Sequence, residues 1–313
     1  MTETATFRGQ EAPRRFDPLF NDAFLRIFGS PDSAPVTRPL LNAVIRSVGL
    51  PEVESVESIT ADAALPGGVA CKTPRLDVVI VSGDGRLFDL EAQRRKVDFG
   101  AKSMLYAAKL LAENTGKGPD DGYASVPRVV VVMLLEGTEM FPESGQIVSA
   151  CRMAWDVDGE PVAGPDCITL VVAELDKVRQ RYNAGNIEDV LADESLAWLY
   201  LLAAGYEHPE EVDRIMGSFP TIEEFAVRYG IAIDDPDLKR AYDNYWLSEL
   251  EYNSVMNQAR KDGRAEGREI GLEEGRAEGR AEGIASMVES LRAAGADEAL
   301  IAAAADAARG AAQ

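Results

Sequence analysis

The feature that most restricts the fold of this chain is an unbroken apolar run, Val129 to Leu135, near its middle. A strand that is apolar at every position is typical of a sheet covered by helices on both faces. The run is far shorter than the roughly 20 apolar residues that span a bilayer. We therefore expect a mixed α/β protein with no membrane segment, and a cytoplasmic location.

Two β-rich runs, Leu76–Val81 and Leu87–Gln93, flank a stretch of Ser, Gly and Asp that predicts a hairpin turn. Another strand is predicted over Ile168–Ala173, and another hairpin around Asp158 and Gly159. Helical spacing predicts helices from Asp17, over 38–48, over 99–113 and from 186 onward. The order strand, strand, helix, strand implies a mixed sheet.

Two carboxylates lie in the first hairpin. A turn centred on Asp84 places Asp77 directly across from Glu91, with their Cβ atoms roughly 4.5–5.5 Å apart. Carboxylates this close repel unless a cation neutralises them or one binds a proton. Mg²⁺ takes such oxygen ligands. Gln93 shares the strand face of Glu91. The pattern indicates an acidic metal site; the alternative is a pair of solvated surface groups.

A basic run, Arg94, Arg95 and Lys96, follows at once and can bind the phosphates of a nucleic acid, although such a run is often only a solvated surface. The net charge of −21 opposes a nucleic-acid partner. However, residues 1–110 hold 14 basic and 14 acidic side chains, so the excess acid lies elsewhere.

Histidine and cysteine chemistry is disfavoured. His208 is the only histidine, which argues against a Ser-His-Asp triad or a His-rich zinc site. The three cysteines are far apart and form no Cys-x-x-Cys pair. Catalysis by this chain therefore has to depend on carboxylates.

The segment Leu76-Asp77-Val78-Val79, followed by Leu90-Glu91-Ala92-Gln93, resembles the core of the PD-(D/E)XK nuclease superfamily. There, an Asp on one strand is followed by Glu-x-Lys on the next. More narrowly, it resembles the recombination-promoting nuclease and transposase family, in which Gln commonly replaces that Lys. Further matches are Asn21 to Gly29, the helix with Lys102 and Tyr106, Glu174 to Lys177, and the Glu-Gly tail.

The resemblance implies a mixed-sheet, restriction-endonuclease-like core. It implies that Asp77 and Glu91 bind Mg²⁺, or alternatively Mn²⁺, with the Ala92 carbonyl as a third ligand. Gln93 cannot act as a base or add positive charge, but it can orient the attacking water.

Two more site residues follow from the same resemblance. Asp22, on the first helix, is expected to complete the acidic site. Lys102 is a candidate for the positive charge that Gln93 does not provide.

The tail is a repeat with glycine at every fourth position from Gly263 to Gly283, and with Arg-Ala-Glu recurring between glycines. Within a unit, Arg and Glu are two residues apart and cannot pair well on one helix. The glycines also weaken a helix by about 1 kcal/mol each. We expect residues 263–283 to form a homo-oligomer; the alternative is a disordered tether.

Together these patterns predict a disordered start (1–15), a nuclease-like domain (16–180), an acidic helical region (181–255) and a helical Gly/Arg/Glu repeat tail (256–313). The predicted function is Mg²⁺-dependent endonucleolytic hydrolysis of DNA, in recombination, mobile elements or defence. The alternative is an inactive nuclease fold that acts as a self-assembling interaction module, favoured by Gln93 and the net acidity.

Overall fold

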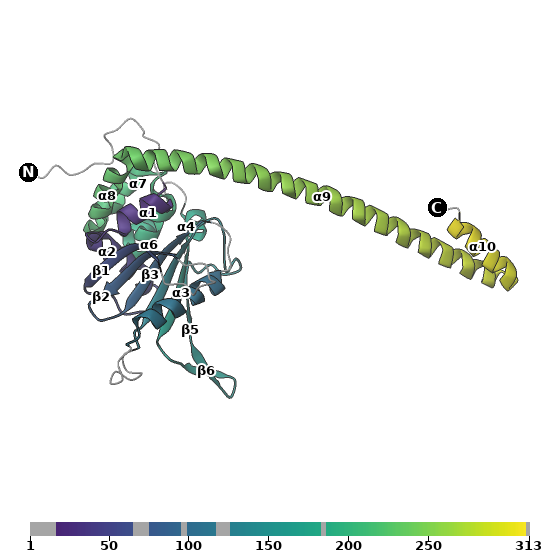
Figure 1. Ribbon diagram of the computed structural model, residues 1–313, viewed down its shortest axis with the longest axis horizontal. Coiled ribbons are helices and arrows are strands. Elements are labelled where there is room, and N and C mark those ends of the chain that lie inside the picture. Colours follow the sequence, from purple (N-terminus) through teal and green to yellow (C-terminus); the bar gives the residue numbers. More distant parts are fainter. Residues whose placement is uncertain (1–16, 65–74, 95–98, 117–125, 183–185, 311–313) are drawn as a thin grey trace, which may run out of the picture. The chain divides into compact units, whose positions relative to one another are not determined.

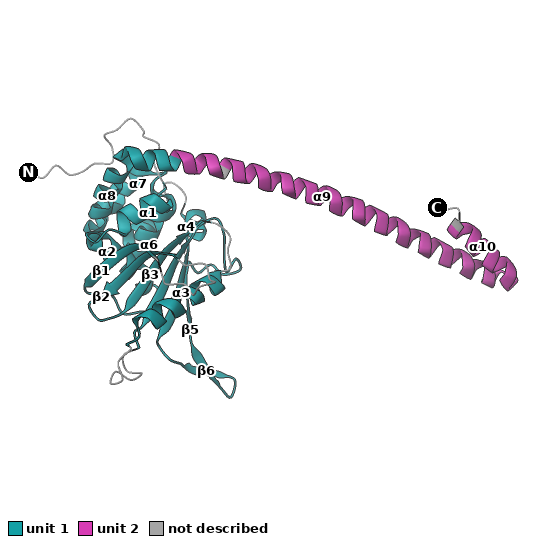
Figure 2. Ribbon diagram, viewed as in Figure 1, with its two compact units in different colours: residues 1–242 teal, residues 243–313 magenta. Residues whose placement is uncertain are grey.

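The computed structural model describes residues 17–64, 75–94, 99–116, 126–182 and 186–310. The prediction of a disordered start therefore lies outside the described residues. The chain divides into two compact units, Met1–Tyr242 and Asp243–Gln313 (Figure 2). Each unit is described by itself below.

The strands are β1 Val56–Ala64, β2 Arg75–Ser82, β3 Leu87–Gln93, β4 Val129–Leu135, β5 Val148–Arg152, β6 Ala154–Val157, β7 Glu160–Ala163 and β8 Ile168–Glu174. Six of them form one sheet in the order β1-β2-β3-β4-β8-β5. The β3-β4 and β4-β8 pairs are parallel, and the β1-β2, β2-β3 and β5-β8 pairs are antiparallel. The predicted mixed sheet is confirmed.

The helices of the first unit are α1 Asn21–Phe28, α2 Ala34–Arg46, α3 Phe99–Asn114, α4 Leu175–Arg181, α5 Glu188–Ala192, α6 Glu194–Tyr200, α7 Pro209–Ser218 and α8 Glu223–Asp234. A π-helical turn, Leu201–Gly205, follows α6, and a 3-10 turn, Pro220–Ile222, precedes α8. The last helices are α9 Pro236–Ala293 and α10 Glu298–Gly310.

The central strand β4 is buried at every residue, as its apolar sequence predicted. On one face of the sheet, Val131 and Met133 join a core cluster with Ala107 and Leu110 of α3. On the other face Phe88 is fully buried, and α1, α2 and α4 contact β2, β1 and β4 (Figure 1). Helices on both faces explain why β4 contains no polar residue.

Some predicted boundaries were wrong. The first helix begins at Asn21 rather than Asp17, because the Asp17 carboxylate accepts a hydrogen bond from the Leu19 N–H and so forms a turn. The second begins at Ala34 rather than 38, with a proline in its first turn. Strand β5 was not predicted, since its sequence, VSACR, has only one fully buried side chain.

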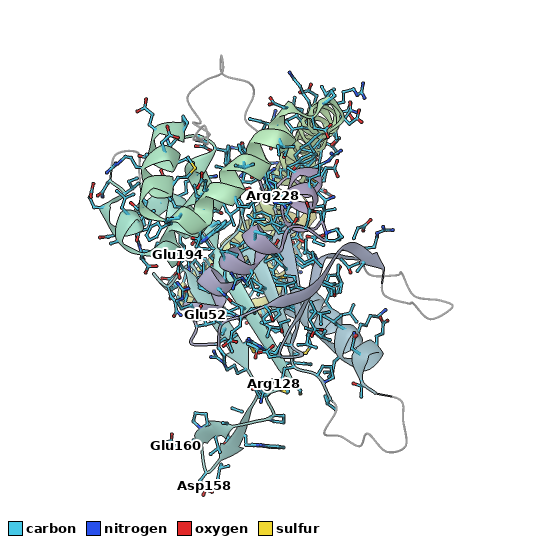
Figure 3. All side chains as sticks on the ribbon, turned by 90° about the vertical axis from the view of Figure 1, so that its left-hand side faces the viewer. Glu52, Arg128, Asp158, Glu160, Glu194 and Arg228 are labelled. Carbon is cyan, nitrogen blue, oxygen red and sulfur yellow. The ribbon has the colours of Figure 1, made fainter. Side chains whose placement is uncertain are left out.

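Helices α5 to α8, which follow residue 186, belong to the first unit. Phe225 of α8 stacks on Phe28 of α1, with 6.0 Å between ring centroids. Arg46 of α2 forms ion pairs with Glu194 of α6 and with Glu52, both labelled in Figure 3. These contacts fix the helical region against the face of the sheet opposite α3.

The predicted hairpin around Asp158 is confirmed as β6-β7, whose side chains are all exposed. Its turn residues Asp158 and Gly159 have φ of 56° and 84°, the left-handed conformation that such turns require. Figure 3 shows Asp158 and Glu160 at the end of a projecting ribbon.

The second unit holds most of α9, together with α10. Gly295 (φ 77°) ends α9, and the Asp297 carboxylate accepts from the Leu300 N–H at 2.8 Å to cap α10. Ile301 and Ala305 of α10 are buried, so the two helices form a hairpin. Among the described helices, none is long and apolar enough to cross a membrane.

Candidate active site

The β2-β3 hairpin brings Asp77 beside Glu91. Its register pairs Val79 with Asp89, as the predicted turn required. The Asp77 N–H donates to Glu91 Oε1 at 2.9 Å, and the Ala92 N–H donates to Asp77 Oδ2 at 3.1 Å. Each carboxylate is therefore held by the backbone of the other's strand, which fixes their orientation.

Lys102, in the first turn of α3, binds this acidic pair through Glu91. Its Nζ donates to Glu91 Oε2 at 2.7 Å and to Gln93 Oε1 at 3.0 Å. The same Nζ lies 5.1 Å from the centroid of the Tyr106 ring, one helical turn later. A lysine from α3 thus stands next to the glutamine that occupies the lysine position of the strand motif.

The electrostatics of the cluster follow from burial. Burial and repulsion by Glu91 raise the pKa of Asp77 to about 7. Burial lowers the pKa of Lys102, but the Glu91 carboxylate more than offsets this, so that pKa stands above its ordinary value. Repulsion between the carboxylates therefore persists beside the Lys102 ammonium, and a second cation would relieve it.

The donor set fits a hard divalent cation. Because the Ala92 N–H faces β2, the Ala92 carbonyl lies on the same side of β3. Two carboxylates and one carbonyl match Mg²⁺, which keeps several waters and uses few protein ligands. In the part of the chain that the structure describes, no three His, Cys, Asp or Glu side chains converge on one metal position. Water and phosphate oxygens would have to complete the coordination.

Asp89 also belongs to this face of β3, and sequence reasoning did not single it out. Its side chain is fully buried, and neither carboxyl oxygen has a hydrogen-bond partner. Burial, then repulsion by Glu91 and Asp77, raises the pKa of Asp89 well above its usual range. Its position two residues before Glu91, inside a strand of mostly apolar residues, could have indicated that Asp89 is buried on the same face as Glu91.

For Asp22, the one hydrogen bond described is with its neighbour Asn21, and none joins it to Asp77 or Glu91. Asp22 lies on the exposed side of α1, where its carboxylate accepts from the Asn21 amide at 3.3 Å. The buried acid of this region is Asp17, whose pKa is raised to about 7 by burial and by Glu136. Asp17 was not predicted as a site residue, although it directly precedes Pro18 at the start of the motif.

Arg94 takes part in a second network. Its guanidinium forms ion pairs with Glu136 at 2.8 Å and with Asp17 at 3.0 Å, while Arg179 binds the other oxygen of Glu136 at 3.0 Å. Arg95 and Lys96, the other predicted DNA-binding residues, lie outside the described residues.

The Glu174–Lys177 motif is structural in this chain. Glu174 ends β8 and accepts hydrogen bonds from the Met140 and Phe141 N–H groups. Lys177 binds Glu174 at 2.8 Å and donates to the Phe141 and Gln146 carbonyls. This buried pair holds the loop after β4 against the sheet.

The comparison with known families decides between the possible meanings of this arrangement. Residues 19–259 match the model of the PD-(D/E)XK nuclease family transposases. The chain belongs to that family. The family resemblance seen in the sequence is thereby confirmed, and the chain is nuclease-like and transposase-like in class. No curated protein and no solved structure gave a match.

Family membership agrees with the topology of the cluster. Asp77 lies on one strand of the antiparallel hairpin and Glu91 on the next, with Gln93 two residues later, which is the order that the resemblance in the sequence implied. Strand β3 pairs in parallel with β4, and α3, which lies between them in the sequence, contributes Lys102 to the site. Nucleases of this family generally use divalent metals.

Proposed function

We propose that this protein is a divalent-metal-dependent endodeoxyribonuclease. The observation that carries the proposal is the buried Asp77–Glu91 pair with the Lys102 ammonium on it, in a chain of the nuclease family. We assign Asp77, Glu91 and the Ala92 carbonyl as ligands of Mg²⁺, for which Mn²⁺ can substitute. When bound, the ion polarises the scissile phosphate and lowers the pKa of an attacking water.

Lys102 and Gln93 share the task of the missing strand lysine. The Lys102 ammonium supplies positive charge where negative charge develops on the phosphate. Gln93 accepts a hydrogen bond from Lys102 through Oε1, and we assign its amide group the role of orienting the attacking water. Their hydrogen bond thus couples a charge on α3 to an amide on β3.

DNA is the proposed substrate, as the nuclease family implies. We propose that Arg95 and Lys96 bind phosphates beside the cut. Arg94, which forms ion pairs with Asp17 and Glu136, is the third proposed DNA-binding residue. Asp22, exposed on α1, retains a proposed role only at the edge of the site.

The proposed setting is recombination, a mobile element or defence. The proposed assembly is a homo-oligomer formed through residues 263–283, which lie within α9.

The test is cleavage of supercoiled plasmid at low salt with Mg²⁺, with Mn²⁺ or with EDTA. Asp77→Ala and Glu91→Ala are compared with wild type, and Asp84→Ala, in the turn of the same hairpin, is the matched control. We expect metal-dependent nicking that both site variants lose, by roughly 10³-fold or more, and that the control retains. Equal nicking by all four proteins would show that the pair is not the active site.

The second candidate is an inactive nuclease fold that serves assembly, which Gln93 in the lysine position favours. Thermal unfolding with and without Mg²⁺ separates the two functions. If the metal site exists, Mg²⁺ stabilises the wild-type protein but not Asp77→Ala, because the ion binds only the folded, intact site. An inactive fold without a metal site shows no such shift and no nicking.

A further inference from the structure

The end of β3, directly after Gln93, is held by charged side chains that lie outside the acidic pair. Glu136, the first residue after β4, is 6% exposed, and its N–H donates to the Gln93 carbonyl at 2.9 Å. Its carboxylate binds two guanidiniums, because Oε2 lies 2.8 Å from Arg94 Nε and Oε1 lies 3.0 Å from Arg179 Nη2. Glu136 therefore holds this strand end through both its backbone and its side chain.

Arg179, on α4, joins Glu136 to the helical part of the first unit. Its Nε donates to the Ala203 carbonyl at 3.1 Å, and its Nη2 donates to the Tyr206 hydroxyl at 3.1 Å. Ala203 lies in the π-helical turn Leu201–Gly205, whose five residues are all buried. Carbonyls in the last turn of a helix lack partners inside it, and Arg179 donates to one of them. This π-turn is thus linked to β3 in two steps, through Arg179 and then through Glu136.

The chain turns closely beside β3 directly after Glu136. Gly137 has a φ of 76°, and a Cβ at this position would lie 3.2 Å from the Arg94 carbonyl oxygen. The Asp176 carboxylate, three residues before Arg179 on α4, accepts a hydrogen bond from the Gly137 backbone. Two side chains of α4 therefore fix the segment that lies against the end of β3.

We propose that Arg179 and Glu136 are positioning residues for Gln93, and that the π-turn is the fixed point from which they act. This inference rests on the proposed nuclease function, in which Gln93 orients the attacking water. Lys102 fixes the Gln93 side chain at Oε1, whereas Glu136 fixes the Gln93 backbone. Both are required, because a misplacement of about 1 Å can lower a reaction rate about 10²-fold. The helical region thereby orients an active-site residue without touching the reacting atoms.

The kinetics of plasmid nicking with Mg²⁺ separate positioning from a structural role. Arg179→Met removes the ion pair with Glu136 and the hydrogen bonds to the π-turn. We expect kcat to fall roughly 10–10²-fold and KM for DNA to change less than about twofold, at a temperature where the variant is folded. Arg179→Lys, which keeps the charge beside Glu136, should recover part of kcat.

Arg181→Met, two residues later on α4, is the matched control, because Arg181 is exposed and donates only to the Gly145 carbonyl among the described contacts. It should keep the wild-type kcat. A folded Arg179→Met protein with the wild-type kcat overturns the proposal, however much its stability has fallen.

A double substitution tests whether the two residues act in series. Glu136→Gln keeps the backbone hydrogen bond to Gln93 and removes the charge that binds both arginines. It should lower kcat by a factor similar to that of Arg179→Met, and the second substitution should then cost little more, because both act through one path. Losses that multiply would show that the two residues act separately and would overturn the proposal.

The side-chain amide signal of Gln93 in a proton–nitrogen correlation spectrum gives a readout that needs no cleavage. The signal is identified by its absence in Gln93→Glu. We expect Arg179→Met to shift or broaden it and Arg181→Met to leave it in place. If wild type nicks no plasmid with Mg²⁺ or Mn²⁺, the nuclease function fails and this signal alone decides the positioning. An unchanged signal in Arg179→Met overturns the proposal.

Discussion

The acidic cluster at the β2-β3 hairpin and the charged repeat of α9 handle their charges in opposite ways. Glu91 is 1% exposed and is bound by a backbone N–H and by Lys102. The repeat exposes every arginine and glutamate from 264 to 282, with like charges aligned. In the first region the sheet and α3 supply the opposite charge. In the second, no ion pair joins two described side chains within 263–283, so water surrounds the charges.

The two regions should therefore respond differently to substitution. Removing one charge from a buried pair of the first unit, such as Lys177 with Glu174, leaves its partner unpaired in a low-dielectric interior, which is costly. Removing one from the repeat leaves the remaining charges in water, which is cheap for the single chain. Stability measurements report on the first unit, and association measurements report on the repeat.

The largest expected effect on stability comes from Lys177→Met. It leaves Glu174, which is fully buried, without its charged partner. We expect a loss of about 3–5 kcal/mol in the free energy of unfolding, measured by chemical denaturation. The matched change in the repeat, Arg276→Met, should alter it by less than about 0.5 kcal/mol. Equal losses of stability would contradict the expectation that only the buried pair needs its partner charge.

Lys102→Met tests whether α3 supplies the charge for catalysis. We expect a loss of roughly 10²–10³-fold in the cleavage rate, as for other groups that stabilise developing charge. Lys102→Arg should retain part of the rate because it keeps the charge. Lys109→Met, on the same helix, serves as the control. An unchanged rate for Lys102→Met would assign this lysine a purely structural role.

The acidic pair predicts a pH dependence in the metal-free protein. The pKa of Asp77 is about 7 when folded, against 3.8 as its ordinary value, so the folded state keeps a proton that the unfolded chain releases. Stability from this group is complete below pH 3.8 and is lost as the pH rises to about 7. Asp77→Asn should remove a slope of up to about 1.4 kcal/mol per pH unit.

Thermal unfolding from pH 4 to 8, in EDTA, measures that slope. Asp17, whose pKa is also about 7, and Asp89, whose pKa is raised by burial, should leave further pH dependence in the variant. Mg²⁺ should stabilise wild type most at the upper end, where both carboxylates are charged. A variant whose stability follows pH as steeply as wild type would contradict this origin of the slope.

The smallest expected effects compare two helix caps. Asp193 caps α6 in the first unit by accepting from the Ser195 N–H at 2.8 Å, and Asp297 caps α10 in the second. Either residue changed to alanine should lower the stability of its own unit by about 1 kcal/mol. Hydrogen exchange localises the loss. A change in both units upon either substitution would show that they unfold together.

Much of the fold could be predicted, because local sequence decided it. The strand Val129–Leu135 and the hairpin 76–93 were predicted from composition and period, and both are present nearly residue for residue. The expected pairing of Asp77 with Glu91 followed from one turn. The position of β5 could not be predicted, since that strand exists only through its pairing with β8.

The partners of the site residues were harder to foresee. Lys102 was suggested by resemblance, whereas its hydrogen bonds to Glu91 and Gln93 depend on how α3 packs on the sheet. Arg94 was predicted to bind phosphate. Its two ion pairs instead join it to Asp17 and Glu136, which are separated from it in the sequence by 77 and 42 positions. Patterns among neighbouring residues cannot predict contacts between residues so far apart in the sequence.

The sequence by itself determined strands β2, β3, β4 and β8, the hairpin register that sets two carboxylates side by side, the family, and the four-residue period of the tail. These depend on side-chain alternation and turn chemistry, which act between near neighbours. Only the tertiary structure decided that Lys102 closes the acidic pair, that Asp89 is buried without a partner, and that Asp22 faces outward. Those outcomes depend on which elements pack together, because burial and ion pairing are properties of surfaces brought together from distant parts of the chain.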